Sequence, residues 1–183
     1  MSKTIAFLRA INVGGHTVKM DRLRALFEQL GFDAVETFIA SGNVVFETDR
    51  APDAALEAEI EAHLKAALGY EVATFLRTDA QVAAVAAHRP LPDAAMAAFA
   101  ALNVGFLSAP LSADEVATLR GFNSDIDDFH AHGREVYWLA RVRQSDSRFN
   151  NNVFERTLRR KATFRGLNTV QRLAAKYPPA GGG

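Results

Sequence analysis

The first 78 residues alternate between strand-like and helix-like segments, and their order limits the folds open to the chain. Short apolar or β-rich runs mark the strands, whereas apolar side chains at i, i+3, i+4 and i+7 mark the helices. The strand-like segments are residues 4–8, 34–39, 44–48 and 71–76, and the helix-like segments are residues 23–30 and 56–68. The order β-α-β-β-α-β is that of ferredoxin-like domains. We therefore predict an α+β protein with a ferredoxin-like portion over residues 1–78.

The second half contains the same kinds of segment in a different predicted order. Ser112 and Glu115 form a capping box at the start of a helix, and Gly133 divides two β-rich runs into a hairpin. Ser147 is expected to start a further helix. The remaining predicted segments are a helix over 79–88, a short helix or loop over 96–101, a strand over 102–107, a loop over 163–168 and a helix from 169. This second α+β lobe, with the order α-β-α-β-β-α-α, is expected to span residues 79–176 and to pack on the first, with a disordered tail over 177–183. The sequence contains no repeat convincing enough to indicate a duplication.

The segment Arg9–Lys19 connects the first predicted strand to the first predicted helix. Gly14 and Gly15 allow positive φ or a close backbone approach. Backbone N–H groups at a helix start attract anions, and Arg9, His16 and Lys19 add positive charge. The pattern is neither a phosphate-binding loop nor a dinucleotide fingerprint. The alternative is an ordinary strand-to-helix loop that needs its glycines only for its own geometry.

Composition excludes several classes of site. The chain has no cysteine, so disulfides, thiolate catalysis and cysteine-based zinc sites are ruled out. His130 and His132 are too few to make a metal site, and we expect no metal and no cofactor. There is no apolar run long enough to cross a bilayer and no leader pattern at Met1, so we expect a cytoplasmic protein without membrane contact.

The net charge of zero conceals an asymmetry along the chain. Residues 134–183 contain 11 Lys and Arg against three acidic residues, a balance of +8, and residues 1–133 have a balance of −8. Such a basic segment attracts phosphates, nucleic acid or an acidic partner. The acidic first part of the same chain is an equally good partner for it. The oligomeric state is left open by the sequence.

Two further polar segments are candidates for a binding site. Ser41-Gly42-Asn43 follows a predicted strand but lacks the nucleophile-elbow pattern, and its alternative interpretation is a tight turn or bulge. The late segment with Thr163, Arg165, Asn168 and Thr169 combines hydroxyl, amide and guanidinium groups, as in a phosphate or carboxylate site. Helix capping accounts for Asn168 or Thr169 but leaves Arg165 unexplained.

Several blocks of the sequence resemble a widespread bacterial family. They include Phe7–Gly15, Ser41–Phe46 and Thr163–Val170, and they occur in the family's order over nearly the whole chain. The family is catalogued as domain-of-unknown-function family 1697. The resemblance implies an α+β fold with a ferredoxin-like portion and brings no established activity. The chain departs from the family at Ala10, where glycine is usual, and at Gly166-Leu167, where Asn-Trp is usual.

We expect three chain-distant turns to converge on one cleft between the two lobes that binds a small anionic, phosphate-bearing ligand. Arg9, Lys19 and Arg165 would neutralise the ligand, and the backbone at Gly14-Gly15 would approach it closely. The expected ligand-binding residues are Arg9, Asn12, Gly14, Gly15, Lys19, Ser41, Gly42, Asn43, Thr163, Arg165, Asn168 and Thr169. One alternative is a nucleic-acid-binding module that uses the basic C-terminal surface. The other is a protein-interaction domain whose motif residues only hold the fold. No reaction is predicted, and whether the protein is an enzyme is left open.

Overall fold

The structure is a computed structural model that describes residues 2–12, 14–39 and 42–181. Its internal contacts divide the chain into two compact units. The first unit comprises residues 1–84 and 173–183, and the second comprises residues 85–172. Each contains one four-stranded antiparallel sheet with helices, which confirms the predicted α+β class.

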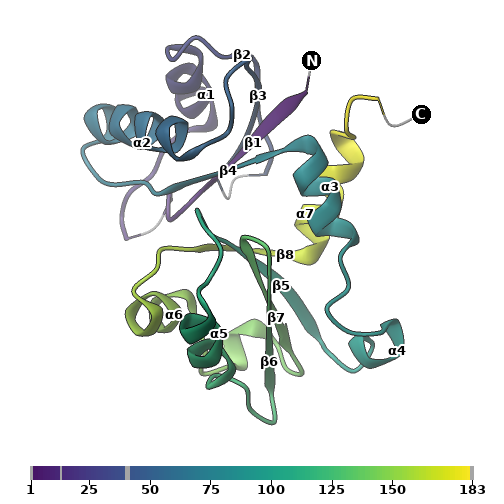
Figure 1. Ribbon diagram of the computed structural model, residues 1–183. Helices are drawn as coiled ribbons and strands as arrows, with labels where there is room; N and C mark the ends of the chain where they lie inside the picture. Colours follow the sequence, from purple (N-terminus) through teal and green to yellow (C-terminus); the bar gives the residue numbers. More distant parts are fainter. Residues whose placement is uncertain (1, 13, 40–41, 182–183) are drawn as a thin grey trace. The chain divides into compact units, whose positions relative to one another are not determined.

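The first unit has the predicted β-α-β-β-α-β order, followed by a helix. Its elements are β1 (Lys3–Leu8), α1 (Met20–Glu28), β2 (Asp33–Thr37), β3 (Asn43–Glu47), α2 (Ala54–Leu68), β4 (Thr74–Thr78) and α3 (Asp79–Ala87), whose last residues belong to the second unit. The strand order in the sheet is β2-β3-β1-β4. Helices α1 and α2 cover one face of this sheet (Figure 1).

Alternating side chains of the strands form the core beneath α1 and α2. Leu8 and Phe46 are fully buried on this face of the sheet, as are Leu23 and Phe27 of α1 and Ile60 of α2. The spacing of these helical residues gives each helix one apolar stripe, which accounts for its position on the sheet. This agrees with the periodicity from which the two helices were predicted.

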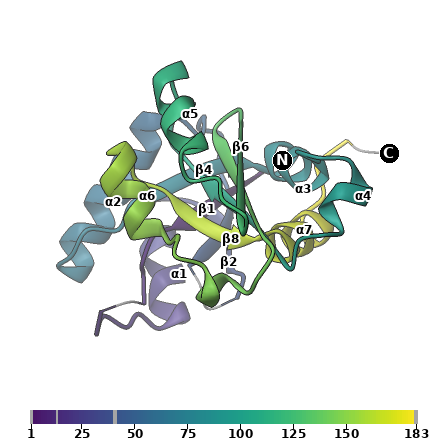
Figure 2. The same ribbon diagram turned by 90° about the horizontal axis from the view of Figure 1, so that it is seen from below.

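The second unit has its own sheet and helices. Its elements are α4 (Asp93–Met96), β5 (Ala101–Phe106), α5 (Ala113–Arg120), β6 (Asp127–His132), β7 (Glu135–Ala140), the 3₁₀ helix η1 (Gln144–Asp146), α6 (Asn151–Leu158), β8 (Thr163–Gly166) and α7 (Leu167–Lys176), whose last residues belong to the first unit. The strand order is β6-β7-β5-β8. The views in Figures 1 and 2 show α5 and α6 on the same side of this sheet.

The two sheets have the same topology, so the chain contains two copies of one supersecondary unit. The order β2-β3-β1-β4 becomes β6-β7-β5-β8 when each strand number is raised by four. Ile5 pairs with Val45 and Arg77 in the first sheet. In the second sheet, Val104 pairs with Tyr137 and Arg165. Aligning these registers matches Thr4-Ile-Ala-Phe-Leu8 with Asn103-Val-Gly-Phe-Leu107.

Two local predictions for the second half are wrong. The loop expected over 163–168 is strand β8 followed directly by the start of α7, because Thr163 to Gly166 pair with β5. The helix expected from Ser147 begins only at Asn151, with Asn150 as its N-cap. The Ser147 hydroxyl instead donates to Asp127 Oδ2 at 2.7 Å and accepts from the backbone N–H of Phe149 at 3.0 Å.

The sequence predicts a disordered tail over residues 177–183. Tyr177 itself is only 5% exposed, and its hydroxyl donates to Glu36 Oε2 at 2.5 Å within the first unit. Burial and the Glu36 carboxylate together raise the pKa of the Tyr177 hydroxyl. This contact fixes the end of α7 to strand β2.

Candidate functional site

The loop between β1 and α1 is held by specific hydrogen bonds. The side-chain oxygen of Asn12 accepts from the backbone N–H of Val18 at 2.7 Å. The Tyr70 hydroxyl donates to the carbonyl of Ile11 at 2.9 Å, and the His16 ring stacks on the Tyr70 ring at 3.9 Å. Burial raises the pKa of the Tyr70 hydroxyl. Asn12 therefore has a structural role that sequence reasoning did not assign to it.

The glycines of this loop are exposed and lie in open space. Gly14 has φ +66° and Gly15 has φ +85°, and a Cβ atom at either position would meet no atom within 4 Å. Both residues thus need glycine for conformation and not because of close packing. Lys19 follows as the N-cap residue of α1, and its side chain makes no capping hydrogen bond.

The turn before β3 lies against the start of this loop. The backbone N–H of Leu8 donates to the carbonyl of Gly42 at 2.8 Å. A Cβ atom at Gly42, where φ is +84°, would lie 2.9 Å from Cγ2 of Ile11. Asn43 is fully buried, and its side-chain amide donates to the carbonyl of Phe38 at 2.9 Å. The structure thus brings Gly42 and Asn43 to the same end of β1 as the Arg9–Lys19 loop, and the predicted Ser41 lies outside the described residues.

The third set of predicted residues belongs to the second unit. Arg165 is 9% exposed, and its Nη1 donates to Thr163 Oγ1 at 2.7 Å and to the Phe164 carbonyl at 3.0 Å. Burial lowers the pKa of Arg165 to about 10. Asn168 and Thr169 lie in the first turn of α7, and Asn168 is exposed.

Arg77 was not singled out from the sequence, although it is the counterpart of Arg165. It is fully buried in β4, and its Nη1 donates to the carbonyl of the preceding residue, Leu76, at 2.8 Å. Arg165 makes the same contact with Phe164. The sheet registers relate the two arginines, since Arg77 pairs with Ile5 of β1 and Arg165 pairs with Val104 of β5.

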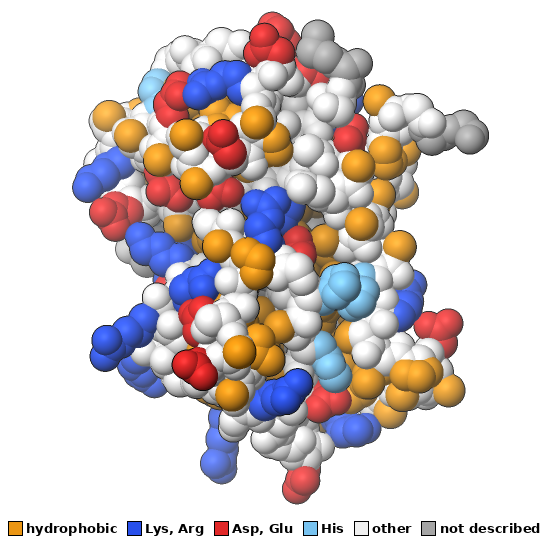
Figure 3. Space-filling model, in the orientation of Figure 1, with side chains coloured by type: hydrophobic (Ala, Val, Ile, Leu, Met, Phe, Trp, Pro, Cys, Tyr) orange, Lys and Arg blue, Asp and Glu red, His pale blue; other side chains and the backbone are white. Residues whose placement is uncertain are grey.

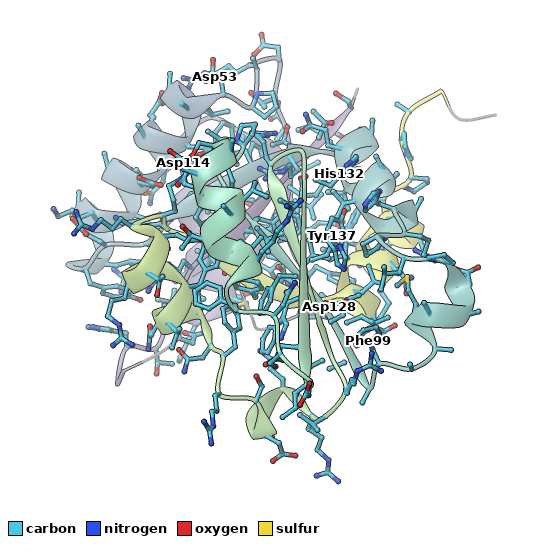
Figure 4. All side chains as sticks on the ribbon, turned by 60° about the horizontal axis from the view of Figure 1, so that its bottom comes forward. Asp53, Phe99, Asp114, Asp128, His132 and Tyr137 are labelled. Atoms are coloured by element: carbon cyan, nitrogen blue, oxygen red, sulfur yellow. The ribbon has the colours of Figure 1, made fainter. Side chains whose placement is uncertain are left out.

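The two histidines of β6 have different neighbours: His132 stacks on another histidine, and His130 Nε2 lies 3.5 Å from Asp128 Oδ2. His132 stacks on His88 with ring centroids 3.9 Å apart, and the His88 ring lies 4.8 Å from that of Tyr137. Figure 4 shows His132 and Tyr137 near one another and Asp128 farther along the hairpin. Burial, followed by the nearby His132, lowers the pKa of His88. Within the described residues, no group of three His, Asp or Glu side chains is arranged to hold a metal ion.

The basic C-terminal segment is partly committed to internal contacts. Arg160 pairs with Glu115 at 2.9 Å and donates to the carbonyl of Ala109 at 2.6 Å. The Arg141 guanidinium lies 4.5 Å from the centroid of the Phe99 ring. Lys and Arg side chains nevertheless gather on the surface over α6, as Figure 3 shows in blue. Exposed Arg156 and Arg159 belong to this part of the chain.

No helix in the described parts of the chain is both long and apolar enough to span a membrane.

Comparisons with known proteins identify the family. The chain matches the family described as "Protein of unknown function (DUF1697)" over residues 1–137. It is also similar to a solved structure, that of conserved bacterial protein SP0830 from Streptococcus pneumoniae. That match has 22% sequence identity and a TM-score of 0.70, and it covers 95% of this chain and 97% of that chain, so the two share a fold. No curated protein matches the chain. Because the family match spans well over half of the sequence and includes the motif blocks Phe7–Gly15 and Ser41–Phe46, this protein belongs to the DUF1697 family of proteins of unknown function.

Proposed function

We propose that the first unit binds a small phosphate-bearing ligand at the loop Arg9–Lys19. The observation that carries the proposal is the start of α1, where the N-cap residue is Lys19, whose side chain has no acceptor for the first backbone N–H groups of the helix. The first backbone N–H groups of a helix have no partner within the helix, and the helix dipole places partial positive charge there. Together they form a site that favours phosphate or carboxylate.

The surroundings of this helix start support an anionic ligand. Gly14 and Gly15 are exposed, so a ligand can approach their backbone closely. Lys19 is exposed and makes no ion pair with any described residue, and half-buried Arg9 adds a second cation at the other end of the loop. Asp21 is the acidic residue of the first turn, and the Arg24 guanidinium lies 3.5 Å from its carboxylate. The balance of charge around the loop is therefore positive.

The contacts divide the predicted residues of the first unit into two roles. Asn12, Gly42 and Asn43 hold the two turns in shape through the contacts described above. The ligand then contacts the Gly14-Gly15 backbone, the first turn of α1, Lys19 and Arg9. The part of Ser41, Thr163, Arg165, Asn168 and Thr169 in ligand binding, and the placement of the ligand between the lobes, stay predictions.

The proposal is tested by NMR titration of the ¹⁵N-labelled protein with inorganic phosphate, ribose 5-phosphate and adenosine monophosphate. We expect saturable shifts of the backbone amides of Gly14, Gly15 and residues 20–22 with at least one of these probes. Lys19→Gln should weaken binding of that probe about tenfold, the usual loss for a hydrogen bond to a charged group.

Lys65→Gln is the matched control, because Lys65 is an exposed lysine of the same unit whose Nζ lies 3.4 Å from Glu71. It should leave binding unchanged. The proposal fails if no probe shifts the loop amides at millimolar concentration, or if the Lys19 and Lys65 variants bind equally well.

A second candidate function is nucleic-acid binding by the surface over α6. Arg156 and Arg159 are exposed there, whereas Arg160 is held by Glu115, so the informative variant is Arg156→Ala with Arg159→Ala. Binding to a nucleic-acid backbone weakens steeply as salt rises. A gel shift that is absent at low salt, or that the double variant leaves unchanged, would remove this candidate.

A further inference from the structure

The second unit has a hollow of about 510 Å³ beside the connection from α5 to β6. Its apolar lining comes from Phe122 and Ile126 of this connection and from Phe149 and Val153, which lie before and in α6. The Phe122 and Phe149 rings pack against one another with centroids 5.3 Å apart. A volume of this order is typical of sites for small molecules, which occupy roughly 300–1,000 Å³.

Buried and partly buried hydrogen bonds hold residues of the lining in place. Asp127 is 6% exposed, and its carboxylate accepts from Trp138 Nε1 at 2.8 Å and from the Ser147 hydroxyl at 2.7 Å. The Ser147 hydroxyl in turn accepts from the backbone N–H of Phe149. Asn123, which also lines the hollow, accepts through its side-chain oxygen from the backbone N–H of Phe129 at 2.9 Å. The hollow is therefore formed before any ligand arrives, which lowers the cost of binding.

Two opposite charges remain available at this hollow. Arg148 and Asp125 both line it and are exposed. Within the described part of the chain, neither makes a hydrogen bond or an ion pair through its side chain, with one another or with any other residue. Asp127, the other carboxylate of the lining, is already occupied by Trp138 and Ser147. The hollow thus presents one cation, one anion and an apolar floor.

We propose that this hollow binds an amino acid with an apolar side chain. The ligand's carboxylate pairs with the Arg148 guanidinium, its ammonium group pairs with the Asp125 carboxylate, and its side chain packs on Phe122, Phe149 and Val153. A guanidinium binds carboxylates through two parallel hydrogen bonds, which makes Arg148 the natural partner of that group. A phosphate dianion is disfavoured, because Asp125 adds a negative charge to the same hollow.

The binding test uses the fluorescence of Trp138, the only tryptophan in the chain. Its indole N–H contacts Asp127, and its ring lies 4.7 Å from that of Phe149, so a ligand in the hollow changes its surroundings. The full probe is L-phenylalanine. Three further probes each lack one of its groups: 3-phenylpropionate lacks the ammonium group, phenethylamine lacks the carboxylate, and glycine lacks the apolar side chain. We expect saturable binding of L-phenylalanine, weaker binding of the two singly charged probes and none of glycine.

Two variants test whether Arg148 pairs with the ligand's carboxylate and Asp125 with its ammonium group. Arg148→Gln should weaken L-phenylalanine about tenfold and leave phenethylamine unchanged, and Asp125→Asn should weaken L-phenylalanine and leave 3-phenylpropionate unchanged. Arg143→Gln is the control, because Arg143 is an exposed arginine nearby in the chain and outside the lining. The proposal is overturned if L-phenylalanine gives no saturable change at millimolar concentration, if glycine binds as well, or if the Arg148 variant matches the Arg143 variant.

Discussion

Ala10 has a backbone conformation that its side chain disfavours. Its φ is +55°, within the left-handed region, and it is half-buried at the start of the Arg9–Lys19 loop. A residue with a Cβ atom in that region carries a strain of about 1–2 kcal/mol, which glycine avoids. The DUF1697 family usually has glycine at this position. The sequence alone shows that alanine replaces the usual glycine here. The positive φ in the structure explains why this replacement strains the backbone.

Ala10→Gly should raise the free energy of unfolding by up to about 1 kcal/mol. The gain is smaller than the strain because glycine also increases the conformational freedom of the unfolded chain. Ala66→Gly, an exposed position within helix α2, is the comparison and should lower the free energy of unfolding by about 1 kcal/mol. Urea unfolding of both variants measures whether each substitution raises or lowers the free energy of unfolding. A loss of stability in the Ala10 variant would contradict the strain argument.

At the scale of the elements, local sequence signals predicted a helix or strand correctly where the contacts that define it lie within the same short segment. The capping box of α5 is confirmed, since the Ser112 hydroxyl accepts from the N–H of Glu115 at 3.1 Å and the Glu115 carboxylate accepts from the N–H of Ser112 at 2.9 Å. Strand β8 was missed because its four residues include a glycine and a buried arginine. Its strand character depends on pairing with β5, some 60 residues earlier, which no local pattern reveals.

The Glu115 carboxylate should make the stability of the protein depend on pH. The hydrogen bond from the Ser112 backbone, followed by the Arg160 guanidinium, holds its pKa below the ordinary value of 4.5. A folded-state pKa that lies below the unfolded value stabilises the fold above the unfolded pKa, and this contribution is lost as pH falls through the folded pKa. Glu115→Gln should therefore cost about 1 kcal/mol at neutral pH and less as pH is lowered below 4.5. Urea unfolding of both proteins at several pH values measures the difference, and a constant difference would contradict the assignment.

At the scale of the whole molecule, the sequence predicted the class and the first unit but not the duplication. The matched strands Thr4-Ile-Ala-Phe-Leu8 and Asn103-Val-Gly-Phe-Leu107 share only their last two residues. For a related reason, the sequence predicted only part of the arrangement of the candidate site. Gly42 meets the Arg9–Lys19 loop through the pairing of β1 with β3, which the β-α-β-β order implies, whereas the burial of Arg165 depends on β8.

The duplication also explains a difference in packing between the two sheets. Ala6 pairs with Leu76 in the first sheet, and the corresponding pair in the second sheet is Gly105 with Phe164. A Cβ atom at Gly105 would lie 2.6 Å from Cε1 of Phe164, which is closer than carbon atoms approach. The smaller residue on β5 therefore makes room for the larger one on β8, and the two positions form a size-matched pair.

This pairing predicts how substitutions at the two positions combine. Gly105→Ala should lower the free energy of unfolding by about 1–3 kcal/mol, because the added methyl group overlaps the Phe164 ring. Phe164→Leu should cost about 1 kcal/mol or more through the lost ring volume. The double variant recreates the alanine–leucine pair of the first sheet, so its loss should be smaller than the sum of the single losses. Gly166→Ala, on the same strand as Phe164 and with nothing within 4 Å of its added Cβ atom, should be nearly neutral. Denaturant unfolding of the four variants measures the coupling, and strictly additive losses would show that Gly105 and Phe164 do not form a matched pair.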